Sequence, residues 1–280
     1  MSILSGLGGL GLGGLEDMDI FDDEEKEKKA KAKADAARID EKDIVFDRTY
    51  ECPVCYLNFP TKTVKTGKAK LLGTDPDLRP KYDIIDPAKY DVILCPRCGY
   101  AALSRFFDKI TQPQAKLVKE KISINVHIPE YDDPICTYKE ALERYKLALV
   151  NAVVKKSRAS EKAYICLKGG WVARGYRESV LADPNPDLNL IAELEQQEDE
   201  YLQNAYKGFV EARQSEGFPM CGMDEATIDY LLAVLAARFK KFDVASKMLA
   251  SVLTSPAANP RMKDRARDLK EEILKELKKK

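Results

Sequence analysis

Histidine is almost absent from this chain of 280 residues. The single histidine, His127, lies in the stretch INVHIP, where alternating apolar and polar residues favour a structural role over ligation. The metalloprotease motif HExxH and zinc sites with two histidines both need a second histidine, so the sequence excludes them. The phosphate-binding loop GxxxxGK followed by Ser or Thr is also missing. We therefore expect a protein that is not an enzyme.

Long apolar runs and net charge are missing too. No apolar run approaches the ~20 residues of a membrane-spanning helix, and the start MSILSGLGGLGLGG lacks the basic residues and cleavage site of a signal peptide. Lys plus Arg and Asp plus Glu both total 46, so the overall charge attracts neither nucleic acid nor membranes. We expect a cytoplasmic protein without membrane insertion.

The composition along the chain divides it into three parts. Residues 1–43 combine a Gly/Leu-rich start with a highly charged stretch, which predicts a disordered leader. Residues 44–133 contain short β-prone pieces separated by turn-rich segments, which predicts a small cysteine-rich, metal-binding module. Residues 134–280 show apolar residues three and four positions apart, which predicts a helical scaffold. The fold class is therefore α+β.

Six amphipathic helices are predicted in the last part. Their ranges are 138–156, 160–181, 188–214, 225–240, 244–254 and 261–277. We expect Asp224, Asp243 and Asn259 to cap the starts of the last three helices. Gly169 and Gly170 interrupt the second helix, where glycine costs ~1 kcal/mol relative to alanine, so another helix should approach closely there. The neighbouring Trp171 would either pack in the apolar core or stack on a ligand.

Three of these helices share a spaced pattern of large and small residues. The instances are Tyr138/Ala141/Tyr145/Ala148, Leu202/Ala205/Phe209/Ala212 and Phe242/Ala245/Leu249/Val252. The pattern is similar to the second helix of a tetratricopeptide repeat, in which alanines let paired helices pack closely. The instances are not spaced at the ~34-residue period of that repeat, and an ordinary helical bundle would give the same pattern.

Four of the seven cysteines form two CPxC pairs, Cys52–Cys55 and Cys95–Cys98. Each pair can form a knuckle, a tight turn that points backbone N–H groups at the first sulfur, with Gly99 relieving the second turn. We expect β pairing to bring the two knuckles together into a four-thiolate site, the set that Zn²⁺ favours. Arg97, Lys62 and Lys65 could offset its negative charge.

One structural Zn²⁺ ion is the leading interpretation of the four cysteines, because four protein sulfurs leave no open position for catalysis. A rubredoxin-like iron centre needs the same ligands, so the ligand set alone does not separate Zn from Fe. Redox-active thiols are a third interpretation, although neither pair lies in a strand-to-helix thioredoxin context. Cys136, Cys166 and Cys221 would be free thiols.

The run ECPVCYLNFPTKTVKTGKAKLLGTDPDLRPKY, followed by YDVILCPRCGYAA and a helical remainder, resembles a bacterial family known as domain of unknown function 2225. The resemblance depends on the two cysteine pairs, on Asp75, Asp77 and Tyr82, and on the tail Gly99–Ala102. It covers most of the chain after residue 43. It implies a bacterial cytoplasmic protein with cysteine-rich and tetratricopeptide-like parts, and implies no activity.

Two kinds of partner follow from these features. A helical scaffold with a zinc module favours a non-enzymatic adaptor that binds a protein or peptide. The cysteine-rich module from Arg48 to Lys109 has eleven basic and seven acidic residues together with aromatic residues that include Tyr50, Tyr56, Phe59, Tyr82, Tyr90 and Tyr100. Such a mixture can bind nucleic acid. Asp75, Asp77, Asp83 and Asp86 lie in a turn-rich loop, where aspartate commonly serves backbone turns, so we expect no acid/base pair there.

Overall fold

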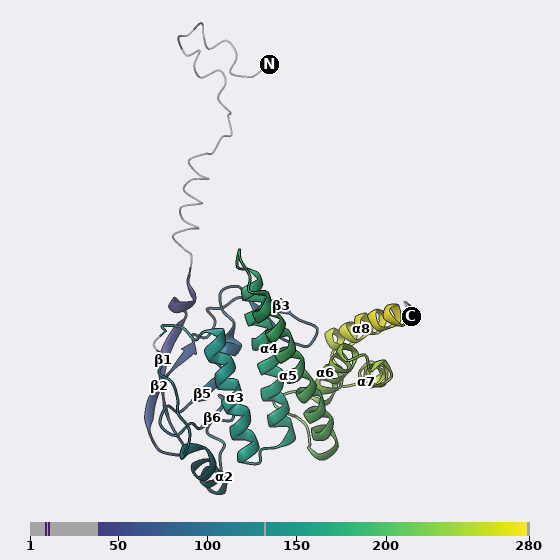
Figure 1. Ribbon diagram of the computed structural model, residues 1–280. Helices are drawn as coiled ribbons and strands as arrows, with labels where there is room; N and C mark the ends of the chain where they lie inside the picture. Colours follow the sequence, from purple (N-terminus) through teal and green to yellow (C-terminus); the bar gives the residue numbers. More distant parts are fainter. Residues whose placement is uncertain (1–8, 10, 12–38, 132, 279–280) are drawn as a thin grey trace. The chain divides into compact units, whose positions relative to one another are not determined.

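The computed structural model describes residues 9, 11, 39–131 and 133–278. The chain divides into Met1–Asp40 and Glu41–Lys280, and nearly all the described residues belong to the second unit. The disordered leader predicted for residues 1–43 thus lies almost wholly outside the described residues. In the second unit, short hairpins precede long helices (Figure 1), which confirms the α+β class. Among the described helices, none combines the length and hydrophobicity needed to span a membrane.

The strands within the described residues form three separate antiparallel hairpins. These are β1 (Val45–Glu51) with β2 (Asn58–Val64), β3 (Leu71–Thr74) with β4 (Pro80–Tyr82), and β5 (Val92–Leu94) with β6 (Ala101–Leu103). The 3₁₀-helices η3 (Glu41–Asp43) and η4 (Pro87–Tyr90) precede β1 and β5. Each knuckle is the turn of its own hairpin, the first between β1 and β2 and the second between β5 and β6. The expectation that β pairing joins the knuckles is therefore wrong; packing of the two hairpins does so.

The β5–β6 hairpin lies between two apolar cores, because successive strand residues point to opposite faces. Val92, Leu94 and Leu103 belong to the larger core, which the helices build. Ile93 and Ala102 belong to a smaller core around the cysteines. All the residues of both strands are buried for this reason. The two-domain boundary at residue 134 stays a prediction, whereas Glu41–Lys280 pack as one compact unit.

A short helix that the sequence analysis missed closes the smaller core. Helix α2 (Gln112–Val118) continues into the π-helical turn η5 (Lys119–Ser123), and Ala115, Val118 and Ile122 are buried against the cysteine hairpins. The backbone N–H and the hydroxyl of Thr111 both donate to Oε1 of Gln114, as part of a capping box. The spacing Thr-x-x-Gln was the available signal, but the segment offers too few apolar positions to show a helical period.

The remaining helices pack one after another along the chain (Figure 1). They are α3 (Tyr138–Val154), α4 (Ala159–Leu181), α5 (Leu188–Ser215), α6 (Glu225–Arg238), α7 (Phe242–Thr254) and α8 (Pro260–Lys278). All six predicted helices are present, with ends within two residues of the predictions. Asp224 and Asn259 cap as expected, because their carboxylate and amide oxygens accept N–H groups of Thr227 and Met262. The Asp243 prediction is wrong, since α7 begins at Phe242.

The small residues of the helices mark close contacts. A Cβ atom at Gly169 would lie 2.7 Å from the Tyr201 ring, and one at Gly170 would lie 2.9 Å from Leu202 Cδ2, so α5 approaches α4 at these glycines as predicted. Trp171 beside them is buried in the larger core. In the shared pattern, every position after the first of each instance is buried. The tetratricopeptide assignment itself stays a prediction.

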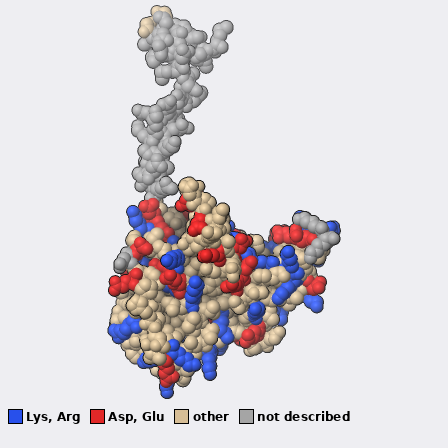
Figure 2. All heavy atoms as spheres, in the orientation of Figure 1, with Lys and Arg blue, Asp and Glu red and all other residues tan. Residues whose placement is uncertain are grey.

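Charges of both signs are interspersed over the face of the molecule shown in Figure 2. This face shows no wide area of basic side chains alone. The mixture agrees with the balanced composition of 46 basic and 46 acidic residues.

Candidate metal centre

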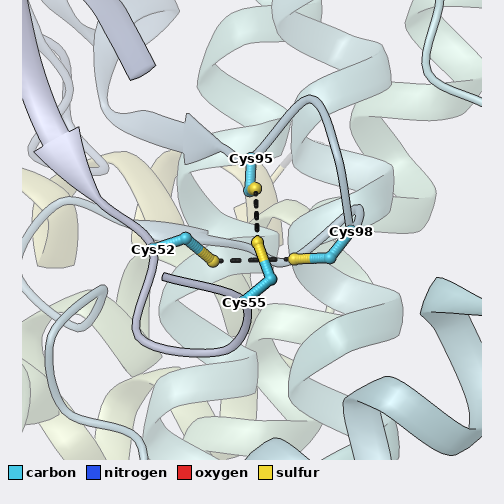
Figure 3. Close-up of side chains that lie close together, drawn as sticks. All are labelled: Cys52, Cys55, Cys95 and Cys98. Carbon is cyan, nitrogen blue, oxygen red and sulfur yellow. Dashed lines mark hydrogen bonds between the residues drawn. The ribbon is translucent and has the colours of Figure 1, made fainter. Parts of the chain in front are cut away.

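The side chains of the two CPxC pairs converge between the β1–β2 and β5–β6 hairpins (Figure 3). The four Sγ atoms, of Cys52, Cys55, Cys95 and Cys98, all lie within 4.8 Å of one another. The distance is 3.5 Å between the Cys52 and Cys98 sulfurs and also between the Cys55 and Cys95 sulfurs. Bonds of ~2.3 Å from a tetrahedral ion would place the sulfurs about 3.8 Å apart, whereas a disulfide needs ~2.05 Å. The spacing thus suits one ion held by four thiolates.

The first knuckle is a tight turn closed at both ends by backbone hydrogen bonds. The N–H of Tyr56 donates to the carbonyl of Cys52 over 2.8 Å, and the N–H of Cys52 donates to the carbonyl of Leu57 over 2.9 Å. Tyr56 has a φ of 59°, in the left-handed region that ordinary side chains disfavour. Inside the turn, backbone N–H groups of Val54 and Cys55 donate to the Cys52 sulfur. A thiolate at Cys52 is stabilised by these donors.

The second knuckle repeats this geometry. The N–H of Gly99 donates to the carbonyl of Cys95 over 3.1 Å, and the N–H of Cys95 donates to the carbonyl of Tyr100 over 2.9 Å. Gly99 has a φ of 68°, so here a glycine takes the left-handed position, as the sequence predicts. Backbone groups of Arg97 and Cys98 donate to the Cys95 sulfur. The two CPxC turns therefore present their sulfurs through one backbone conformation.

The second knuckle is also fastened from outside its own hairpin. The Ser123 hydroxyl of η5 donates to the carbonyl of Cys98 over 2.8 Å. The Asn151 amide of α3, itself fully buried, donates to the carbonyl of Gly99 over 2.9 Å. Val126 lies so close to Gly99 that a Cβ atom there would be 2.7 Å from its Cγ1. Helix α3 thus helps to set the position of two of the four sulfurs.

Aromatic side chains shield the sulfurs from water. Cys52, Cys95 and Cys98 are buried, and Cys55 is partly exposed. Phe107 is fully buried in the same core, with its ring centroid 5.1 Å from that of Tyr100 and 6.3 Å from that of Phe59. The Tyr100 hydroxyl donates to the Phe107 carbonyl over 2.9 Å, which satisfies its one polar group.

The expectation that Lys62 and Lys65 offset the negative charge of the four cysteine sulfurs is wrong. Lys62 forms an ion pair with Asp47 at 2.9 Å, and Lys65 donates to the carbonyl of Asp43 over 2.7 Å. Both partners lie at the end of the β1–β2 hairpin away from the knuckle. Lys119 is better placed, because its ammonium group lies 5.9 Å from the ring of Tyr56, which follows Cys55. Lys155 lies equally close to the Tyr100 ring but is already paired with Glu161.

Hydrogen bonds among the sulfurs set the protonation of the cysteines when no ion neutralises them. Bonds from Cys52 and Cys98 lower the pKa of the Cys95 thiol, and its bond with Cys95 raises the pKa of Cys52 to about 12. Binding of an ion to all four thiolates must release the remaining protons, so metal affinity falls as the pH falls.

The donor set defines what such a site can do. Four thiolates and no carboxylate suit a thiophilic ion such as Zn²⁺ or iron, and do not suit Mg²⁺ or Ca²⁺. Since protein sulfur fills all four positions of a tetrahedron, no position is left for water or substrate. The arrangement can join two hairpins, and it offers no Lewis-acid chemistry at a bound ion.

The four cysteines predicted as ligands are thus brought together, and their metal binding stays a prediction. The other candidates lie elsewhere: His127 is exposed, and Cys136, Cys166 and Cys221 are free thiols outside the cluster. Two residues that position the knuckle, Ser123 and Asn151, were missed. No sequence signal identifies them, because their role depends on contacts between distant segments.

The aspartates of the turn-rich loop hold the loop in place, and three of them do so partly through arginine. Asp83 and Asp86 accept the backbone N–H groups of Ile84 and Ala88, as expected for turns, and Asp86 also lies 3.7 Å from Arg79 Nη2. Asp75 and Asp77 instead pair with Arg174 of α4, at 3.0 and 2.6 Å. These carboxylates are neutralised within the fold.

Comparisons with known proteins place the chain among proteins without an assigned activity. A family model described as "Uncharacterized protein conserved in bacteria (DUF2225)" matches residues 45–273. An uncharacterized protein of Borreliella burgdorferi is 23% identical over 188 residues, which cover 61% of this chain and 65% of that relative. The match thus spans slightly less than two thirds of the relative's length. No solved structure matches the chain.

Proposed function

The chain belongs to the DUF2225 family of uncharacterized bacterial proteins, and on that premise we propose that it is a non-enzymatic, zinc-binding adaptor of the cytoplasm. In this proposal one Zn²⁺ ion joins the two knuckles, and helices α3–α8 provide a surface for a protein partner. The convergence of four cysteine sulfurs within 4.8 Å supports the zinc part most directly.

The role of the ion is structural in this proposal. Cys52, Cys55, Cys95 and Cys98 would hold it, and it would supply a covalent-like link between hairpins that share no β pairing. The smaller core has far fewer buried residues than the larger one, so the free energy of metal binding, on the order of 10 kcal/mol, would be a major part of its stability. A rubredoxin-like iron centre is the alternative that uses the same four ligands.

The adaptor role is supported by what the helices leave exposed. Val150 and Val153 of α3 are 51% and 59% exposed, three residues apart and so on one face of the helix. They lie beside Asn151, the residue that contacts the second knuckle. An apolar helix face of this kind, next to a fastened module, suits a partner helix or peptide.

Metal analysis tests the zinc part of the proposal. The purified protein is expected to hold one zinc ion per chain and to be colourless, whereas Cys95→Ser should lose most of the metal. Cys221→Ser is the matched control, because Cys221 is a free thiol outside the cluster. Iron with a visible absorption band would favour the rubredoxin-like alternative. Full zinc occupancy in Cys95→Ser would contradict the four-ligand site.

Interaction measurements with a surface variant test the adaptor part. A partner captured by the zinc-loaded wild type should be lost with Val150→Glu/Val153→Glu. Lys247→Glu on α7 changes the net charge by the same two units and should keep the partner, because Lys247 is exposed on another helix. Equal capture by both variants would show that this face of α3 is not the interface.

A further inference from the structure

A cavity of about 570 Å³ lies where three parts of the fold meet. Its walls come from the segment after β6, from the turn between α3 and α4, and from the loop after α5, around residues 105–114, 156–161 and 216–222. In Figure 1 the α3–α4 turn and the end of α5 lie at the lower end of the helices. None of the four metal-site cysteines lines it.

Four cations line this cavity: Arg105, Lys109, Lys156 and Arg158. The side chains of Lys109, Lys156 and Arg158 are exposed and make no ion pair or hydrogen bond with any residue that the structure describes. They stand in contrast to the arginines of α4, which carboxylates surround. The cavity therefore has three positive charges without a partner on its wall.

Arg105 is held in a fixed position at the edge of the cavity. Its guanidinium donates to the carbonyl of Cys221 and lies 5.7 and 5.5 Å from the ring centroids of Phe106 and Tyr164. Cys221 and Gly222 form a tight turn, closed by hydrogen bonds between Met220 and Met223 in both directions. A guanidinium held in this way keeps its remaining N–H groups for a second acceptor.

The two carboxylates of the cavity already have partners. Glu161 forms an ion pair with the buried Lys155 at 2.8 Å. Glu216 accepts the backbone N–H of Ser160 at 3.0 Å and the Ser160 hydroxyl at 2.5 Å, so it occupies the start of α4. The four lining cations and Lys155 outweigh these two glutamates by three positive charges.

We infer that this cavity binds a phosphorylated small molecule that carries about three negative charges, such as a diphosphate group. Guanidinium and ammonium groups together suit phosphate oxygens, which accept several charge-assisted hydrogen bonds at once. The volume exceeds that of one phosphate ion and leaves room for an organic part against Phe106, Pro219 and Met220. This inference is independent of the zinc and adaptor proposals, because it uses neither the cysteines nor the exposed face of α3.

Calorimetric titration of the zinc-loaded full chain with pyrophosphate tests this site. The wild type should bind, and Lys156→Gln/Arg158→Gln should bind about tenfold more weakly or worse, because each charge-assisted hydrogen bond contributes ~1.5 kcal/mol or more. Lys247→Gln/Arg261→Gln is the matched control, since it removes the same two types of cation from exposed positions that do not line the cavity. It should retain wild-type affinity. Metal content and circular dichroism of each variant establish that it is folded.

Two outcomes would overturn the inference. The first is absence of pyrophosphate binding by the wild type, or an equal loss of affinity in both double variants. The second is binding of a short single-stranded oligonucleotide through Lys156 and Arg158 while pyrophosphate does not bind. That second result would assign the cations to a nucleic-acid surface.

Discussion

At the scale of single residues, the two knuckles differ in the side chain at their left-handed position. Gly99 combines a φ of 68° with contact to Val126, whereas Tyr56 adopts a φ of 59° with an exposed ring. A side chain in this region costs about 1–2 kcal/mol. Tyr56 in the first knuckle carries this conformational cost. At Gly99 in the second knuckle, Val126 leaves no space for a side chain, whatever the backbone conformation costs.

The substitution Gly99→Ala should therefore lower the free energy of unfolding by more than the cost of placing a side chain in the left-handed region. Its Cβ atom would lie 2.7 Å from Val126 Cγ1, so Val126 or the knuckle must move. Gly67→Ala is the control, because Gly67 has a similar φ of 75° and no atom within 4 Å of the added Cβ. Denaturant unfolding should give a loss of about 1 kcal/mol for Gly67→Ala and more than about 2 kcal/mol for Gly99→Ala. Equal losses would show that the Val126 contact has no effect.

At the scale of elements, a buried carboxylate joins three helices. Glu198 of α5 is fully buried and lies 2.9 Å from Arg174 Nε, 3.0 Å from Arg177 Nη2 and 3.0 Å from Arg238 Nη2. Arg174 and Arg177 belong to α4 and Arg238 to α6. Burial opposes the charge of Arg174, but Asp77 and Glu198 outweigh this effect and raise its pKa. The glutamate thus holds α4 and α6 to α5 and, through Arg174, to the β3–β4 loop.

Glu198→Gln should destabilise the protein by about 3 kcal/mol, because it removes a fully buried negative charge that pairs with three arginines at once. Glu195→Gln on the same helix is the control. Glu195 is 60% exposed and lies 3.4 Å from Arg177, so its pair should contribute less than about 1 kcal/mol. Thermal and denaturant unfolding of the two variants measure the difference. A loss below about 1 kcal/mol for Glu198→Gln would mean that the helices do not depend on this carboxylate.

At the scale of the whole molecule, the β5–β6 hairpin ties the cysteine site to the helices. Its alternate residues serve both cores, and Asn151 of α3 contacts the knuckle at its end. A change at the cysteine cluster should therefore reach the helical part, although the cysteines lie far from most helices in sequence.

Removal of metal by a strong chelator should lower the unfolding temperature of residues 41–280 in one transition, by about 10 °C or more, because a loss of several kcal/mol acts on a unit of this size. Hydrogen exchange should become faster in α3 as well as in the hairpins. Addition of zinc should reverse both effects. Two separate transitions, with α3 unaffected, would contradict this coupling and would support independent domains.

The sequence by itself determined the helices and the identity of the clustered cysteines, because both depend on local spacing. Apolar residues at three and four positions defined α3–α8 within two residues, and two CPxC turns indicated which sulfurs could meet. Helix α2 was not predicted, because seven residues are too few to show a helical repeat of apolar positions.

Only the tertiary structure decided how those pieces are joined. The knuckles meet because separate hairpins pack together. Asn151 and Ser123 donate hydrogen bonds to the second knuckle. Asp75 and Asp77 form ion pairs with Arg174, about a hundred residues away in sequence. The cations of the cavity likewise come together from segments that are distant in sequence. Such contacts depend on the positions of whole elements in space, and a local sequence pattern carries no information about those positions.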